Sequence, residues 1–208
     1  MKGLILKDIY NLRKHGRTML LLAAAYSFMI FMTGNAEVFL GTVVIMFAAT
    51  SITSLSYDSQ SGWDTYVSTL PVSRSDVVMS KYILSYLFAL AGGLIALLIG
   101  WINGIIKNSG NFFEMLVSAY VMFSIAVVFV SVLLPLIYKF GVERSRIIII
   151  AAVAIPVAAV FAIVKTGVAT MPNDQMVTRI LFLSPFILAI CVVLSYAISN
   201  MVYRKKEV

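Results

Sequence analysis

Long apolar runs alternate with short polar breaks along most of the chain. A helix needs roughly 20 mainly apolar residues to cross the hydrocarbon core of a bilayer. The pattern therefore predicts an all-α integral membrane protein with about six transmembrane helices in a single domain, residues 1–208. The predicted spans cover residues 18–32, 38–57, 82–106, 113–138, 147–164 and 185–203.

The segment before the first span, residues 1–17, has a helical pattern of its own. Leu4, Ile9 and Leu12 recur at helical spacing, and charged residues that include Lys7 and Asp8 occupy the other side. A basic amphipathic helix beside a span usually lies in the membrane interface. We therefore predict an interfacial helix here, and a soluble tail is the alternative.

Residues 165–184, the segment before the last span, allow two interpretations. Ser184 followed by Pro185 is typical of a helix start, with a capping residue and proline at the first helical position. On that basis residues 176–184 are predicted to form a separate short helix that dips into the outer leaflet. The alternative is that they form the first turns of a longer, kinked span.

Composition indicates that the chain lies in a bilayer, and the distribution of basic residues indicates its orientation there. The chain is 61% hydrophobic and only 12% charged, against about 25% charged residues in soluble domains. Thirteen of the sixteen Lys and Arg residues fall in the segments 1–17, 58–81, 139–146 and the C-terminal tail. Cytoplasmic segments carry an excess of basic residues, so these segments and both termini are predicted to be cytoplasmic. Because the basic residues flank spans, we expect no nucleic-acid partner.

The predicted spans lack the residues that membrane chemistry needs. No Asp, Glu, Lys, Arg or His lies in their interior, and Glu114 stands only at the start of the fourth. Ion-coupled transporters place ionisable groups within the membrane, and metal enzymes need clustered ligands. The phosphate-binding loop G-x-x-x-x-G-K-[ST] is also missing. We therefore predict that the chain is not an enzyme and binds no cofactor itself.

Small residues recur at every fourth position in the third and fifth spans, a spacing that allows close helix contact in lipid. Packing within one chain explains the pattern, and a dimer interface is the alternative. The residues are Gly92, Ala96, Gly100 and Gly104, then Ala154, Ala158 and Ala162. Ser124 and Ser131 in the fourth span are candidate path-lining residues, although such serines more often bond to their own helix.

The polar segment 58–81 separates the second and third spans and carries the most distinctive pattern. Trp63, Tyr66, Val67 and Leu70 fall at i, i+3, i+4 and i+7, which predicts a short helix with one apolar stripe. Pro71 is expected to end this helix. Ser73 is a candidate cap for a second helix that starts near Arg74 and continues into the third span. The stripe either anchors a partner protein or lies flat on the bilayer.

Two stretches resemble a known family. The run Gly62–Tyr66, then Leu70–Arg74, with Ser80–Tyr82, resembles the cytoplasmic loop of small ABC-2 type transporter permeases, and Met1–Asp8 is similar to their N-terminus. The resemblance implies a bacterial multi-pass protein of the cell membrane, in which the loop is a coupling helix docked on an ATPase. The residues it places at that interface are Trp63, Asp64, Tyr66, Val67, Leu70, Pro71 and Arg74.

The same resemblance implies an assembly and a function. Two copies of a separate ATPase subunit bind ATP and Mg, and a second permease chain, identical or paralogous, completes the pore. The chain looks most like exporters of amphipathic peptides such as phenol-soluble modulins, or of antimicrobial and other hydrophobic compounds. Two alternatives stay open: a membrane scaffold or sensor subunit that transports nothing, and a secondary transporter. The latter requires Glu114 or Asp58 deep in the bilayer.

Overall fold

The computed structural model of the chain describes residues 2–33, 36–107, 112–145, 147–148, 150 and 174–205. Within these residues the backbone is helical apart from short turns, and it contains no strand, which confirms the all-α class for this part of the chain. The helices are α1 (Lys2–Thr33), α2 (Ala36–Ala48), α3 (Thr50–Gln60), α4 (Trp63–Val67), α5 (Arg74–Lys107), α6 (Phe112–Phe140) and α8 (Asp174–Arg204).

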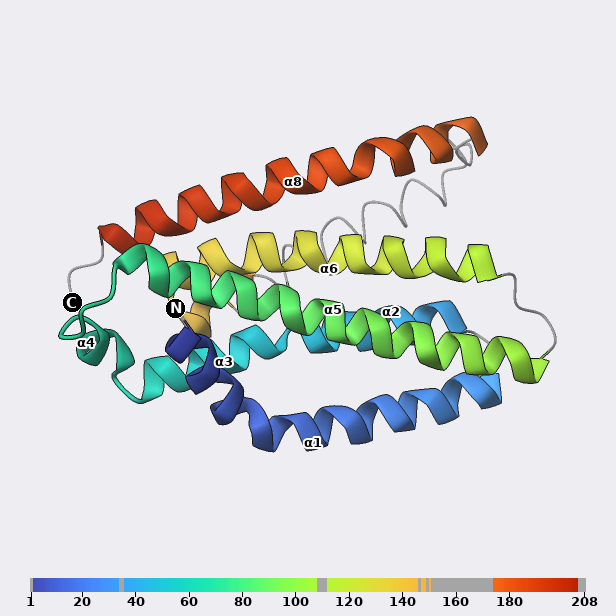
Figure 1. Cartoon of the computed structure of the whole chain (residues 1–208), viewed down its shortest axis with the longest axis horizontal. Helices are drawn as coiled ribbons and strands as arrows, with labels where there is room; N and C mark the ends of the chain where they lie inside the picture. The colour runs from blue at the N-terminus through green and yellow to red at the C-terminus, as the bar shows by residue number, and fades with distance from the viewer. Residues whose placement is uncertain are drawn as a thin grey trace.

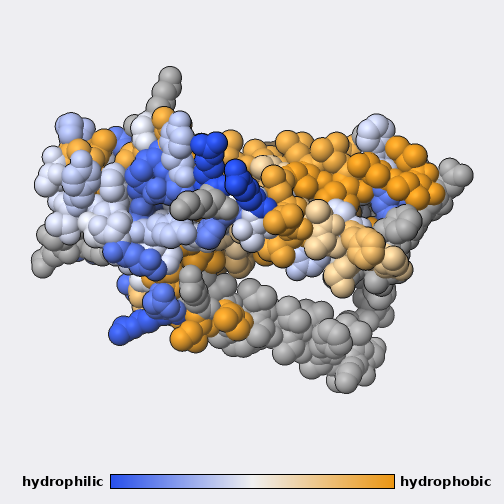
Figure 2. All heavy atoms as spheres, turned by 90° about the horizontal axis from the view of Figure 1, so that it is seen from below, coloured by the Kyte–Doolittle hydropathy of each residue, from blue (hydrophilic) through white to orange (hydrophobic). Residues whose placement is uncertain are grey.

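The long helices run side by side, and α5 packs against both α2 and α6, while α6 also packs against α8 (Figure 1). The start of α1, the short helix α4 and the end of α8 lie at the same end of the bundle (Figure 1). On the face shown in Figure 2, hydrophilic side chains gather at that end, and apolar side chains cover the other part. Large exposed apolar surfaces mark contact with a membrane or a partner.

Four helical segments in the described part are long and apolar enough to cross a membrane: Leu40–Gln60, Arg74–Ile106, Met115–Phe140 and Leu181–Arg204. They correspond to the predicted second, third, fourth and sixth spans. The predicted first span lies within α1, and the predicted fifth lies almost entirely outside the described residues. The described part thus contains four candidate membrane spans, and the number six stays a prediction.

The core lies where α2, α5 and α6 meet. Val44, Ala89 and Val130, one from each helix, are fully buried there. Gly92 lets α5 approach α2 closely, because a Cβ atom at position 92 would lie 2.7 Å from Phe47 Cβ. The neighbouring small residue Ala96 is buried as well. In the third span, the small-residue pattern therefore serves packing within the chain.

The remaining small residues of the two patterns lie in different surroundings. A Cβ atom at Gly100 would lie 3.1 Å from Leu40 Cδ1, so this glycine also faces α2. Gly104 is half-buried near the far end of α5. Residues Ala154, Ala158 and Ala162 lie outside the described residues.

The last helix corrects the preferred interpretation of residues 176–184. They do not form a separate helix, because α8 runs without a break from Asp174 to Arg204 with Pro185 in its interior. Proline has no N–H to offer the carbonyl four residues back, which here belongs to Leu181. The Ser184 hydroxyl donates to that carbonyl at 2.8 Å instead. The residue read as a helix cap thus compensates for the proline within a continuous helix.

The N-terminal segment also departs from the expected pattern. Residues 2–17 form the first turns of α1, and this part is inclined to the rest of the helix (Figure 1). Leu4 and Leu12 are buried, as an apolar face requires, but Ile9 of the same predicted face is 45% exposed, and Asp8 is buried with 1% of its surface exposed. The predicted polar side, which included Lys7 and Asp8, does not simply face water. Its acidic member points into the bundle.

Candidate functional site: a short helix above a buried charge network

The short helix α4 follows α3 through a tight reversal at Gly62, whose φ of 66° lies in the left-handed region that glycine adopts without strain. It begins at Trp63, as predicted, but ends at Val67, earlier than Leu70. The hydroxyls of Ser68 and Thr69 donate to carbonyls of the preceding turn, which offers the backbone an alternative to further helix. The helix therefore stops before it reaches Pro71.

The apolar stripe of α4 is divided between the bundle and the surface. Val67 is buried in the main core, and Trp63 and Leu70 pack against that core. Tyr66 is 59% exposed and is the member of the stripe that faces outward. The stripe therefore anchors α4 to the bundle and leaves one aromatic ring exposed.

The flanking residues fix the path into α5. Ser73 Oγ accepts a hydrogen bond from the Asp76 backbone N–H at 3.1 Å, and α5 begins at Arg74, so the predicted cap is confirmed. The exposed Arg74 donates to the Arg204 carbonyl at 2.7 Å and so connects α5 to the end of α8. Pro71 is exposed, and the side chain of Asp64 is outside the described set.

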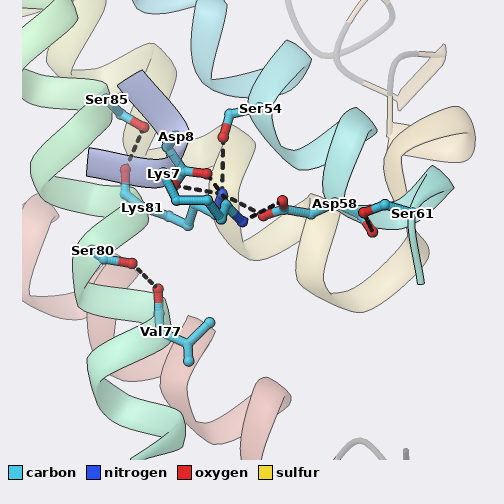
Figure 3. Close-up of polar contacts among 9 residues, drawn as sticks. All are labelled: Lys7, Asp8, Ser54, Asp58, Ser61, Val77, Ser80, Lys81 and Ser85. Atoms are coloured by element: carbon cyan, nitrogen blue, oxygen red, sulfur yellow. Dashed lines mark hydrogen bonds and ion pairs between the residues drawn. The ribbon is translucent and has the colours of Figure 1, made fainter. Parts of the chain in front are cut away.

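Beneath α4, two lysines and two aspartates form a network that joins α1, α3 and α5 (Figure 3). Lys7 donates to Asp58 Oδ1 at 2.6 Å. Lys81 donates to Asp8 Oδ2 and to Ser54 Oγ, each at 2.8 Å. Lys81 Nζ also lies 2.5 Å from Asp58 Oδ2 as an ion pair. Every pair in this network joins two different helices, apart from Lys7 with its neighbour Asp8 at 3.3 Å.

Burial makes these contacts interdependent. The side chains of Asp8, Asp58 and Lys81 are 2%, 8% and 4% exposed, and Lys7 is 25% exposed. A buried charge is tolerated only when it is paired and hydrogen-bonded. The two positive and two negative side chains balance each other, so each charge depends on the other three.

The network is connected to the surface through Lys7. Its Nζ lies 3.6 Å from the centroid of the Trp63 ring, a cation–π contact that reaches from α1 to α4. Trp63 in turn contacts Tyr66, with ring centroids 5.5 Å apart. An open groove beside them is lined by Gly3, Leu4, Lys7, Trp63, Tyr66, Leu70 and Val72. The start of α1 and α4 thus form one continuous surface.

The sequence pattern did not reveal this network. The pattern places Lys7 and Asp8 on the outer face of an interfacial helix and Asp58 at the start of a cytoplasmic loop. In the structure Asp58 lies on α3, which continues to Gln60, and Lys81 lies on α5, as the predicted helix start near Arg74 implies. The sequence feature that hints at the network is the equal number of Asp and Lys, two of each, near the predicted membrane boundary.

The candidate path serines have different environments. Ser124 Oγ donates to the Tyr120 carbonyl of its own helix at 2.8 Å, which is the commoner role. Ser131 is buried and lies 3.0 Å from Tyr86 OH on α5, and its carbonyl accepts from Ser195 Oγ at 2.5 Å. Ser131 therefore belongs to a hydroxyl network between helices.

That network continues along α8. Tyr82 OH lies 2.5 Å from Ser195 Oγ and 2.8 Å from Ser199 Oγ, and both serines are buried. Ser75 at the start of α5 bonds Tyr196 at 2.7 Å. Hydroxyl pairs hold the C-terminal half of α8 to α5 and α6, whereas most of its apolar side chains are exposed.

Comparison with known proteins gives one match. A family model described as "ABC-2 family transporter protein" matches residues 3–204, nearly the whole chain. No curated protein and no solved structure matches the chain. In the described residues there is also no group of three or more His, Cys, Asp or Glu that could hold a metal ion.

Proposed function

The chain belongs to the ABC-2 family of transporter proteins, and on that basis we propose that it is the pore-forming subunit of an ATP-driven exporter. Family membership makes it a permease of an ABC transporter, a membrane component that is not itself catalytic and that associates with an ABC ATPase. The proposal adds that this ATPase is a separate chain, that two copies hold ATP and Mg, and that a second permease chain, identical or paralogous, completes the pore.

In this proposal α4 is the coupling helix that docks on the ATPase. The placement of α4 carries the argument: it projects at the hydrophilic end of the bundle, with Tyr66 exposed and Val67 anchored in the core. A short helix that is joined to α3 and α5 by tight turns and anchored in the core by Val67 is suited to pass on a movement. Aromatic and Arg side chains are frequent interface anchors, which supports Tyr66 and Arg74 as contacts.

The mechanism that follows is mechanical. When two ATPase subunits close on ATP, the α4 helices move with them, and the movement reaches α3 directly and α5 through the short turn before Ser73. The cleft between two permease chains then changes the side to which it opens. Amphipathic peptides, antimicrobials or other hydrophobic compounds are the proposed cargo. Ser131 is not proposed to line this cleft, because it is buried between α5, α6 and α8 within one chain.

Co-purification tests the docking role. We expect Tyr66→Ala to reduce the amount of ATPase that is recovered with the tagged permease in mild detergent, because the exposed ring is lost while the buried anchor Val67 remains. Tyr10→Ala is the matched control, since Tyr10 is similarly exposed, at 64%, but lies on α1. Equal ATPase recovery with both variants would reject α4 as the docking helix. Recovery of no ATPase from the native host would favour the scaffold or sensor alternative.

The secondary-transporter alternative required an intramembrane charge. Asp58 does lie within the candidate span Leu40–Gln60, but in the last turn of α3, next to α4. Its carboxylate is neutralised by Lys7 and Lys81. A carboxylate held by two cations at the end of a span is poorly suited to bind a coupling ion. The side chain of Glu114 is outside the described set.

A further inference from the structure

We propose that Lys7 is a positioning residue that holds the start of α1 and α4 together as one unit and connects this unit to α3 and α5. The part of this inference that concerns transport rests on the proposed docking of an ATPase on α4. The part that concerns the link between helices does not, and it can be tested on the permease alone.

Lys7 on α1 contacts both α4 and α3. One contact is with the Trp63 ring of α4 at 3.6 Å, and the other is with Asp58 Oδ1 of α3 at 2.6 Å. A lysine held over an indole face by a carboxylate resists displacement, because moving it separates both favourable pairs. Displacement of α4 therefore pulls on α1.

The second lysine extends the link to the centre of the bundle. Lys81 on α5 contacts Asp8 of α1 and Asp58 of α3, so each carboxylate lies between the two cations. Movement of Lys7 changes the environment of Asp58 and hence of Lys81. This route reaches α5 across the charge network, separately from the peptide chain through Ser73.

Stability alone is a weak reason for such a network. Replacing a buried ion network with apolar side chains of similar size is often neutral or stabilising, whereas ion pairs fix one arrangement of the elements that carry them. The network is therefore better suited to hold four helices in one register than to maximise their stability.

The test uses a charge-balanced pair of substitutions. Lys7→Met with Asp58→Asn removes one positive and one negative charge, so no net charge remains buried. The hydrogen bond from Lys81 to Asp8 is retained. This variant should fold and insert, because the change replaces a pair and does not orphan one partner. Monodisperse elution from a sizing column checks that expectation.

The readout is the distance between α1 and α4 in lipid nanodiscs without ATPase. Spin labels are attached at Gly3→Cys and Ser68→Cys after Cys191→Ser removes the only native cysteine. Both positions are exposed, and nothing lies within 4 Å of the space that a Cβ at position 3 would occupy. With Lys7 and Asp58 present, pulsed EPR should give one narrow distance peak. The charge-balanced variant should shift and broaden it.

Lys139→Met is the matched control. Lys139 also lies over an aromatic ring, with its Nζ 5.1 Å from the centroid of Phe140, and it is exposed near the same end of the molecule. Its loss should leave the α1–α4 distance unchanged. If the charge-balanced variant folds and shows the same narrow peak as the native chain, the positioning role of Lys7 is wrong.

A second measurement separates this inference from the docking proposal. In the reconstituted complex, the charge-balanced variant should retain its ATPase partner but lose permease-dependent stimulation of ATP hydrolysis by about tenfold, within the usual range of coupling effects. If Tyr66→Ala leaves ATPase recovery unchanged while the distance peak still broadens, the docking proposal fails and the positioning role stands. Full stimulation in the variant would overturn the transport part of the inference.

Discussion

Individual residues decide how closely the helices approach. At Gly92 a Cβ atom would lie 2.7 Å from Phe47 Cβ and 3.3 Å from Val44 Cα, so α2 or α5 would have to shift. We expect Gly92→Ala to destabilise the fold by about 1–3 kcal/mol, the usual cost of overpacking. Gly93→Ala is the control, because its nearest contact would be Phe123 at 4.0 Å. Thermal unfolding in detergent that ranks the two equally would contradict this packing.

The N-terminal cap of α5 is expected to contribute to the stability of the fold. Ser73→Ala removes the acceptor of the Asp76 N–H, and loss of such a cap costs about 1 kcal/mol. The same thermal assay should therefore show a lower midpoint for Ser73→Ala. Ser68→Ala also deletes an exposed hydroxyl, one that donates to the Thr65 carbonyl, and we expect it to change stability by less. The reverse order would mean that the cap contributes little.

Residue spacing predicted the cap but not the charge network. Ser73 and Arg74 are neighbours in the chain, so local pattern is enough to identify a helix start. The contact between Asp8 and Lys81 joins residues that are 73 positions apart, and Asp58 is 51 positions from Lys7. Helical periodicity orders side chains around one helix and carries no information on which neighbour will face them.

Between elements, hydroxyl pairs decide how α8 is held. Tyr82→Phe removes the hydroxyl that contacts Ser195 and Ser199, and hydrogen bonds between membrane helices contribute about 0.6 kcal/mol on average and about 1–2 in stronger cases. We expect faster proteolysis and lower thermal stability for this variant. Tyr10→Phe, at an exposed position on α1, should match the native chain. If both variants behave alike, the hydrogen bonds of Tyr82 contribute little to holding α8.

The elements also show where a local pattern misleads. Pro185 after Ser184 has the form of a helix start, yet the helix passes through both residues. The backbone carbonyl that proline leaves without a donor is satisfied by the Ser184 hydroxyl. In lipid each unsatisfied polar group is costly, so such compensation within a span is expected. Ser184 followed by Pro185 is compatible with a helix start and with a proline inside a helix. The helical residues before Pro185 in the structure show that the second applies.

Across the bundle, the hydrophilic surface, the predicted cytoplasmic segments and the candidate docking helix lie at the same end. The start of α1, α4 and the end of α8 share the hydrophilic end of the bundle. Thirteen of the sixteen Lys and Arg residues lie in residues 1–17, 58–81, 139–146 and the C-terminal tail, and the cytoplasmic side attracts basic residues. The apolar runs thus predicted the class and four of the spans. The assembly with partner subunits depends on surfaces between chains, which the pattern within one chain does not encode.

This agreement gives a prediction about topology that also tests the number of spans. In the Cys191→Ser background, single cysteines at positions 68 and 144 should react with an impermeant maleimide only after the cells are permeabilised. Cysteines at positions 108 and 165 should react in intact cells, because six spans with cytoplasmic ends place both on the outer side. Labelling of position 165 only after permeabilisation would show that residues 147–164 do not cross the membrane. Labelling of position 68 in intact cells would put α4 on the side that has no ATP, and the docking proposal would fail with it.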